Sequence, residues 1–178
     1  MSIAVVDQLI LDRGVTAGDE WITVAPERVP EALRALRQQG FQTLSFLTAV
    51  DHIDQVHTGA PTPQSVEQTD NTPTPARFEL VYQLRSIQDH RTLRVRTFPT
   101  GEFPAVHTVS DIYPNANWDE REVYDLFGVK FEGHPDLVRI LLPDDWVGHP
   151  LRRDYPMGGE PVDFSDDQET WHTTPAPA

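Results

Sequence analysis

The sequence predicts an α+β fold: a small mixed or antiparallel sheet of about four strands with helices packed on one face, followed by an extended Pro-rich C-terminal arm. Three observations predict it. Some stretches alternate apolar and polar residues, as strands do. Others repeat apolar residues every three or four positions, as helices do, and prolines and glycines recur after residue 128. A chain of 178 residues suffices for one domain with appendages.

A strand and a helix are expected first. Residues 21–24 are short and apolar, which indicates a strand, and Pro26 suits the first turn of a helix. Leu33 and Leu36 continue a helical apolar stripe, and Gly40 stands where such a helix would end. We expect this helix to cover the sheet.

Three further strands follow from alternation. Residues 42–50, 77–85 and 93–96 place apolar side chains at every second position, so each strand should have one apolar and one polar face. The short segment 86–90 should join the last two strands as an antiparallel hairpin. Residues 55–76 are rich in proline, threonine and glutamine, and we expect them to form a disordered polar insertion.

A second helix is predicted to begin with Asn117 as its cap and to end at Gly128, with an apolar stripe that includes Val123 and Phe127. This completes the predicted α+β domain, residues 1–128.

Residues 129–156 form the predicted arm, because repeated Gly and Pro block any long helix or central strand. The arm nevertheless carries many large apolar residues: Phe131, Leu137, Ile140, Leu141, Leu142, Trp146, Leu151 and Tyr155. An irregular segment rarely exposes so much apolar surface to water, so we expect it to bind a partner polypeptide. Residues 157–178 should be an acidic, flexible tail.

Composition excludes several function classes. The chain has 28 acidic and 14 basic side chains, a net charge of −14, which argues against nucleic-acid binding. It has no cysteine, which excludes disulfides, thiolate zinc sites and cysteine-ligated iron–sulfur clusters within it. The most apolar run, 44–50, is too short to span a membrane, and the start lacks the features of a secretory signal. We expect a cytoplasmic location.

Two kinds of catalytic site are conceivable from the residues present. Glu120 and Glu122 could form an acid–base pair, but residues two apart on a helix point about 200° away from each other. We therefore favour a capping contact for Glu120 and an ion pair between Arg121 and Asp125.

The second catalytic alternative is an autonomous metal-dependent enzyme using His134 and His149, which both occur in Gly-His-Pro with aspartates nearby. The two histidines are fifteen residues apart in a chain bent by proline, which is unlike the usual local spacing of metal ligands. The common nucleotide-binding and hydrolase motifs are absent as well. We favour a protein without its own active site or metal.

The second helix and the arm carry a more specific signal. Residues 120–128 read EREVYDLFG and residues 131–137 read FEGHPDL. They are followed by RIL at 139–141, PDDW at 143–146 and GHPLRRDYP at 148–156. These blocks, in this order, resemble the signature of the 30 kDa subunit of respiratory complex I, the C-type subunit of the bacterial NADH-quinone oxidoreductase. Where that family commonly has two consecutive basic residues after HPDL, this chain has Val138 and then Arg139.

The resemblance implies a cofactor-free subunit of a proton-translocating NADH:quinone oxidoreductase. Its arm would embrace the 49 kDa-like (D-type) subunit and touch the ferredoxin-like, cluster-bearing (I-type) subunit. FMN and the iron–sulfur clusters would lie in partner subunits. The complex would hold the chain peripherally on the cytoplasmic side of the bacterial plasma (inner) membrane. The same small subunit occurs in related membrane-bound hydrogenases, which stays an alternative.

The positions that match the signature are the candidate docking residues, and among them the arginines could form fork-like pairs with carboxylates. The candidates are Glu120, Arg121, Glu122, Tyr124, Asp125, Phe127, His134, Pro135, Arg139, Trp146, His149, Arg152, Arg153, Asp154 and Tyr155.

Overall fold

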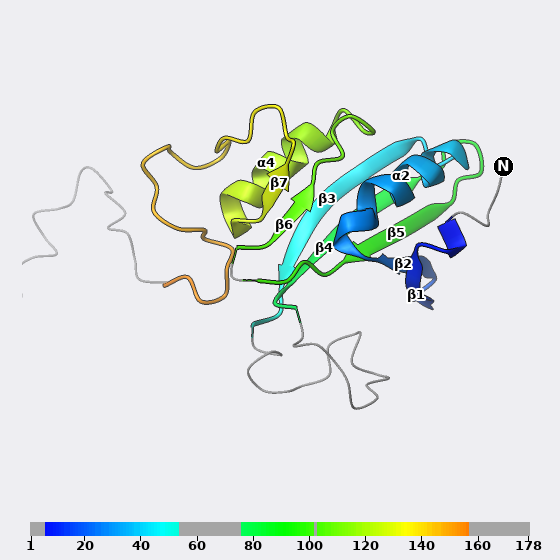
Figure 1. Cartoon of the computed structure of the whole chain (residues 1–178), viewed down its shortest axis with the longest axis horizontal. Coiled ribbons are helices and arrows are strands. Elements are labelled where there is room, and N and C mark those ends of the chain that lie inside the picture. The colour runs from blue at the N-terminus through cyan, green and yellow to red at the C-terminus, as the bar shows by residue number, and fades with distance from the viewer. Residues whose placement is uncertain (1–5, 54–75, 102, 157–178) are drawn as a thin grey trace, which may run out of the picture.

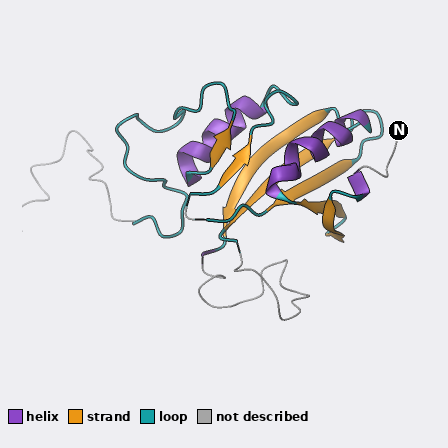
Figure 2. Ribbon diagram, in the orientation of Figure 1, coloured by secondary structure: helices purple, strands orange, loops and turns teal. Residues whose placement is uncertain are grey.

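The fold was obtained as a computed structural model, which describes residues 6–53, 76–101 and 103–156. The predicted tail, 157–178, and nearly all of the predicted insertion, 55–76, lie outside these residues. The described part is an α+β fold, as predicted (Figures 1 and 2).

The main sheet has five strands rather than about four. They are β1 (Ile10–Thr16), β2 (Asp19–Val24), β3 (Thr43–Asp51), β4 (Phe78–Arg85) and β5 (Thr92–Thr97). Their spatial order is β1-β2-β5-β4-β3, and neighbours are antiparallel except for the parallel pair β2–β5. The sheet is therefore mixed, and β4 and β5 form the predicted hairpin.

Strand β1 was not predicted from the sequence. It is an edge strand whose hydrogen bonds come from β2, and its apolar residues Leu11 and Val15 are 70% and 67% exposed. Because β1 buries no continuous apolar face, its sequence lacks the alternation that identifies a half-buried strand.

Two helices pack against one face of the sheet. The 3-10 turn η1 (Pro26–Arg28) leads into α2 (Val29–Gln38), whose buried stripe includes Leu33 and Leu36, as predicted. The second helix, α4 (Ala116–Phe127), adds Val123 and Phe127 to the same apolar core as β3, β4 and β5. The short strands β6 (Ala105–His107) and β7 (Lys130–Glu132) pair in parallel beside α4 (Figure 1).

Helix α4 begins earlier than predicted. Its N-cap is Asn115, not Asn117, and the Asn115 side chain donates to the carbonyl of Leu44 (2.8 Å) instead of capping the helix. Asp119 accepts the backbone N–H of Leu47. These contacts satisfy polar backbone groups on the free edge of β3, so α4 protects that edge from pairing with another strand. The helix ends at Gly128, as predicted.

The second face of the sheet is polar, as alternation predicted, but its centre is buried. Glu79 is hydrogen-bonded to Arg96 and to Nε2 of His52 (2.8 Å). Arg96 lies between the rings of Trp21 and Phe98, 4.8 and 5.3 Å from their centroids. Burial raises the pKa of Glu79, but the hydrogen bonds from His52 and Arg96 outweigh it and lower the pKa overall.

Within the described residues, no helix has both the length and the apolar character needed to cross a bilayer.

Candidate functional site

The arm returns across α4 after β7 and then reaches the end of the main sheet. Strand β7 pairs with β6 and belongs to the domain, so the irregular part of the predicted arm begins at Gly133 rather than at residue 129. From Gly133 to Pro156 the chain forms only turns, bends and extended segments. Its course is therefore fixed by side chains and not by a ladder of backbone hydrogen bonds.

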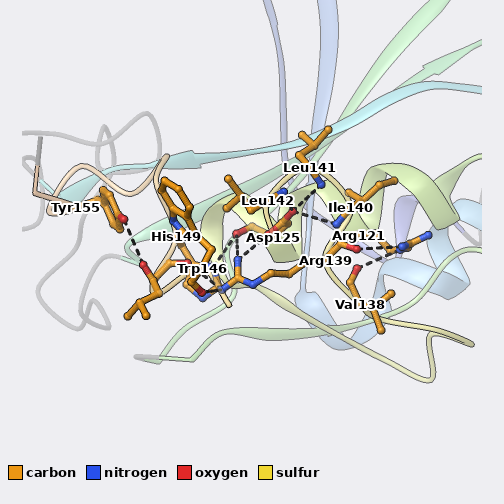
Figure 3. Close-up of polar contacts among 12 residues, drawn as sticks. Arg121, Asp125, Val138, Arg139, Ile140, Leu141, Leu142, Trp146, His149 and Tyr155 are labelled. Atoms are coloured by element: carbon orange, nitrogen blue, oxygen red, sulfur yellow. Dashed lines mark hydrogen bonds and ion pairs between the residues drawn. The ribbon is translucent and has the colours of Figure 1, made fainter. Parts of the chain in front are cut away.

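Asp125 fixes the middle of the arm (Figure 3). Its Oδ2 atom accepts the backbone N–H groups of Ile140 (3.1 Å), Leu141 (2.9 Å) and Leu142 (2.9 Å). Its Oδ1 atom accepts Nη1 of Arg139 at 2.6 Å. Burial raises the pKa of this fully buried carboxyl, but the three N–H donors and Arg139 together lower it. Asp125 is thus a buried carboxylate around which the arm turns.

Arg121 does not form the predicted ion pair with Asp125. Its guanidinium donates to the carbonyls of Val138 and Arg139, each at 3.1 Å, and lies 5.2 Å from the ring centroid of Trp118. The prediction was wrong because Asp125 points into the arm, where stronger partners surround it. Arg121 instead holds the arm by its backbone, and the carbonyl, not the side chain, of Val138 makes this contact.

Arg139 and His149 close a loop of the arm. The second guanidinium nitrogen of Arg139 donates to the carbonyls of Trp146 and Gly148, each at 3.1 Å. Nδ1 of His149 is 2.8 Å from the carbonyl oxygen of Asp125. Arg139 therefore binds a helix carboxylate and two arm carbonyls at once, which suits the fixed fork of a guanidinium.

Gly128 allows the arm to approach the end of α4. A Cβ atom here would lie 2.5 Å from side-chain atoms of both His149 and Arg152, and the residue has φ +75°. Nε of Arg152 donates to the carbonyl of Phe127, which α4 leaves without a helical donor. Glycine is therefore required for its left-handed backbone and for the space that it leaves.

The end of the arm is joined to the main sheet by ion pairs and hydrogen bonds. Arg77, just before β4, donates to both Asp154 in the arm (2.5 and 3.0 Å) and Asp51 at the end of β3 (2.7 and 3.0 Å). The N–H of Arg153 donates to Asp51 at 3.0 Å. Burial raises the pKa of Asp51, and these hydrogen bonds more than reverse the effect. The contact joins residues 102 positions apart.

Glu120 and Glu122 point in different directions, as helical geometry predicted. Glu122 is exposed, whereas Glu120 is fully buried and accepts Thr108 Oγ1 (2.5 Å) and the N–H of Val109 (2.7 Å). The predicted capping contact of Glu120 is therefore wrong, because the side chain bonds to the loop after β6 and not to the start of its own helix.

The two Gly-His-Pro histidines serve the arm separately. Nδ1 of His134 accepts the N–H of Asp136 (3.0 Å), and its Nε2 lies 3.2 Å from the carbonyl of Asn117. His149 contacts Asp125 instead. In the part of the chain that the structure describes, no three His, Asp or Glu side chains are grouped so that they could hold a metal ion. The geometry does not favour the metal-dependent enzyme.

The candidate docking residues fall into three classes of exposure. Buried are Glu120, Asp125 and Phe127; exposed are Glu122, Pro135, Arg153 and Asp154; partly buried are Arg121, Tyr124, His134, Arg139, Trp146, His149, Arg152 and Tyr155. The buried ones can act only by holding the others. Arg77, which binds Asp154, and Trp118, which contacts Arg121, were not among the candidates, because nothing in the local sequence pattern connects them with the arm.

The outer surface of α4 and the arm is apolar at several points. Trp118 is 58% exposed, Leu141 61%, Val147 85%, Leu151 51% and Val138 45%. Together we call these residues the apolar docking surface. All of them except Trp118 lie on the arm, which is held in place by Asp125, Arg121 and Arg139 of the same chain. The sequence did not lead us to expect this.

Comparisons with known proteins show the family to which the chain belongs. Residues 22–161 match the family model described as the 30 kDa subunit of the respiratory-chain NADH dehydrogenase. The C-type subunit of NADH-quinone oxidoreductase from Salinispora tropica is 36% identical over 159 residues, which are 89% of this chain and 57% of the relative. The equivalent subunit of Geobacter sulfurreducens is 41% identical over 151 residues, 84% of this chain and 82% of the relative.

Among solved structures, a chain of the membrane-bound sulfane sulfur reductase, an archaeal respiratory membrane complex, has a TM-score of 0.65 and 26% identity. The match covers 86% of this chain and 85% of that one. This chain spans little more than half the length of the Salinispora relative, 57%. The family match begins within β2 and includes β3, β4, β5 and the helix–arm site, and the chain belongs to the family of the 30 kDa subunit of the respiratory-chain NADH dehydrogenase.

Proposed function

We propose that this chain is a cofactor-free structural subunit of a proton-translocating NADH:quinone oxidoreductase, and that it assembles through the apolar docking surface. One observation carries the proposal: an irregular arm is held on α4 by hydrogen bonds to a buried carboxylate while several of its large apolar side chains are exposed. Large apolar side chains that are exposed repeatedly along one segment often mark a protein interface.

The proposed partners are the 49 kDa-like (D-type) subunit and the ferredoxin-like, cluster-bearing (I-type) subunit. In this arrangement FMN and the iron–sulfur clusters belong to partner subunits, and the chain lies peripherally on the cytoplasmic side of the bacterial plasma (inner) membrane. Its own contribution is to position its neighbours. Because Asp125, Arg121 and Arg139 order the arm beforehand, binding would lose little conformational entropy.

Two arm substitutions and one matched control test the proposal. Leu141→Asp and Leu151→Asp place a charge on the docking surface, whereas Leu11→Asp places one on β1, where the side chain is 70% exposed. We expect the arm variants to reduce the 49 kDa-like subunit that copurifies with the chain, and to reduce inhibitor-sensitive NADH:quinone activity of membranes, at least tenfold. Leu11→Asp should change neither.

The assembly of the arm variants could also contradict the proposal. If Leu141→Asp and Leu151→Asp assemble as well as Leu11→Asp, the arm is not the docking surface. Each purified variant should first give the circular-dichroism spectrum and unfolding midpoint of the wild type, so that loss of assembly is not loss of folding. All three side chains are more than half exposed, so we expect unfolding free energies within about 0.5 kcal/mol of wild type.

A second candidate function keeps the same role in a different complex. The likeness to a chain of the membrane-bound sulfane sulfur reductase supports a role in a related complex that uses another electron donor or acceptor. The membrane-bound hydrogenase type is the corresponding alternative from the sequence. NADH oxidation by quinone in membranes, lost on deletion of this chain, supports the NADH-type complex. Hydrogen evolution or sulfane sulfur reduction lost in its place supports the alternative.

A further inference from the structure

The interior of the α4 region contains an acidic group that the docking surface does not use. Glu120 is fully buried, and within the described residues no Lys or Arg forms an ion pair with it. Nε2 of His134 lies 3.9 Å from its Oε2. Because Nδ1 of His134 accepts the N–H of Asp136, the proton of His134 is on Nε2 and faces the carbonyl of Asn117. Among the residues that the structure describes, Glu120 therefore has no cation to offset its charge.

A chain of hydroxyl groups connects Glu120 to the surface. Thr108 Oγ1 is 2.5 Å from Oε2 of Glu120 and 2.9 Å from Oγ of Ser110. Thr108 and Ser110 both line an open cleft of about 940 Å³ between the start of α2 and the loop that follows β6, which Glu31 also lines. A proton can thus move between the cleft and the buried carboxyl by reorienting two hydroxyls.

Both charge states of Glu120 can be hydrogen-bonded in this geometry. When the carboxyl is ionised, Thr108 donates to Oε2 and Ser110 donates to Thr108. When a proton arrives from the cleft, Oε2–H donates to Thr108, and Thr108 donates to Ser110. The N–H of Val109 donates to Oε1 in either state. The difference between the states is therefore the cost of burying an uncompensated charge.

We propose that Glu120 is a buried proton-binding site, loaded from the cleft through Thr108 and Ser110, whose ionisation weakens the contact between α4 and the loop after β6. This goes beyond the docking function proposed above and does not depend on it.

The other ionisable groups around Glu120 support the same conclusion. Asp119 on α4 and Asp111 in the loop are both acidic, and Tyr82 faces it from β4. Burial, first, and these two carboxylates raise the pKa of Glu120 to about 7, although the bonds from Thr108 and Val109 lower it. Burial and the charge of Glu120 also raise the pKa of Tyr82. Every charge named here opposes ionisation of Glu120.

Amide hydrogen exchange in the full chain tests the proposal. The folded pKa lies above the ordinary value of 4.5, so the stabilisation is complete below 4.5 and is lost as the pH rises towards about 7. One linked proton changes the local opening constant at most tenfold per pH unit. Between pH 5.5 and 7, the protection of the Val109 amide should fall by about fifteenfold, and above about pH 8 it should level off.

Glu120→Gln imitates the protonated side chain and should give Val109 a protection that does not depend on pH. Glu122→Gln, two residues along the same helix but exposed, should keep the wild-type dependence. The same slope in Glu120→Gln as in wild type would overturn the proposal. Carbon-13 NMR of glutamate carboxyls in the wild type supplies a second readout that needs no variant: a midpoint near 7 for Glu120 supports the proposal, and one between 4 and 5 overturns it.

The route through the hydroxyls has its own test. Thr108→Val removes a hydrogen bond that lowers the pKa of Glu120, so the NMR midpoint should rise, whereas Thr108→Ser should leave it unchanged. A midpoint that is the same in Thr108→Val and wild type would contradict the hydrogen bond from Thr108 to Glu120 with which the proposed proton path begins.

Discussion

Replacing Asp125 with asparagine should detach the arm from α4. The substitution keeps the size of the side chain but removes the negative charge that accepts three backbone N–H groups and the guanidinium of Arg139. One amide oxygen can still accept some of these donors. The amide nitrogen must then face either Arg139 or an N–H group, so two donors oppose each other.

The magnitude follows from these contacts. A hydrogen bond to a charged group contributes about 1.5–3 kcal/mol, and breaking a buried ion pair by removing one partner costs about 3–5 kcal/mol. Asp125 is fully buried, whereas the Arg139 side chain is 16% exposed and can recover some hydration. We therefore expect Asp125→Asn to lower the unfolding free energy by about 3 kcal/mol.

Two measurements on the isolated chain check this expectation. Urea unfolding followed by circular dichroism gives the change in free energy. Hydrogen exchange of the amides of Ile140, Leu141 and Leu142 shows whether the loss is local to the arm. Asp144→Asn, an exposed arm residue, is the matched control and should change neither. If Asp125→Asn kept these amides protected and the free energy within about 0.5 kcal/mol of wild type, the carboxylate would not be what orders the arm.

Three further predictions concern the ends of the arm. Gly128→Ala should lower the unfolding free energy in urea by at least about 2 kcal/mol, because the residue has positive φ and the new Cβ would meet His149. The control Gly101→Ala, also at positive φ but in open space, should lower it by only about 1 kcal/mol. Equal losses would refute the steric argument. Arg77→Met should lower the unfolding free energy by about 2 kcal/mol at pH 7, because it leaves the buried Asp51 without its cation. The pKa of Asp51 is lowered in the fold, so its stabilisation is present above the ordinary value of 3.8 and is lost as the pH falls below it. The unfolding free energies of the wild type and Arg77→Met should therefore converge in acid. A constant difference between them down to about pH 2.5 would contradict this.

Local sequence patterns predicted the elements correctly wherever one continuous face of a strand or helix is buried. The alternation in 77–85 identified β4, and the helical stripe with Leu33 and Leu36 identified α2, because their side chains face one continuous core. The same reasoning failed for β1, where neither face is buried, and for the three-residue strands β6 and β7, which are too short to show any period.

The candidate site, too, was predicted correctly in part. The sequence placed the candidate docking residues on α4 and the arm, and it predicted that Glu120 and Glu122 diverge. It paired Arg121 with Asp125 because they are four residues apart on a helix. In the structure Asp125 forms its ion pair with Arg139 instead, because the carboxylate is turned toward the arm, where it also accepts three backbone N–H groups.

The sequence alone determined the fold class, most of the strands and helices, the end of α4 at Gly128 and the family signature, because each depends on residues that are close together in the chain. Only the tertiary structure decided how the arm is held. Asp125 meets Leu142 across 17 positions, and Arg77 meets Asp154 across 77. Such contacts depend on the path of the whole chain. The residues around a carboxylate in the sequence do not indicate which distant N–H groups it will accept.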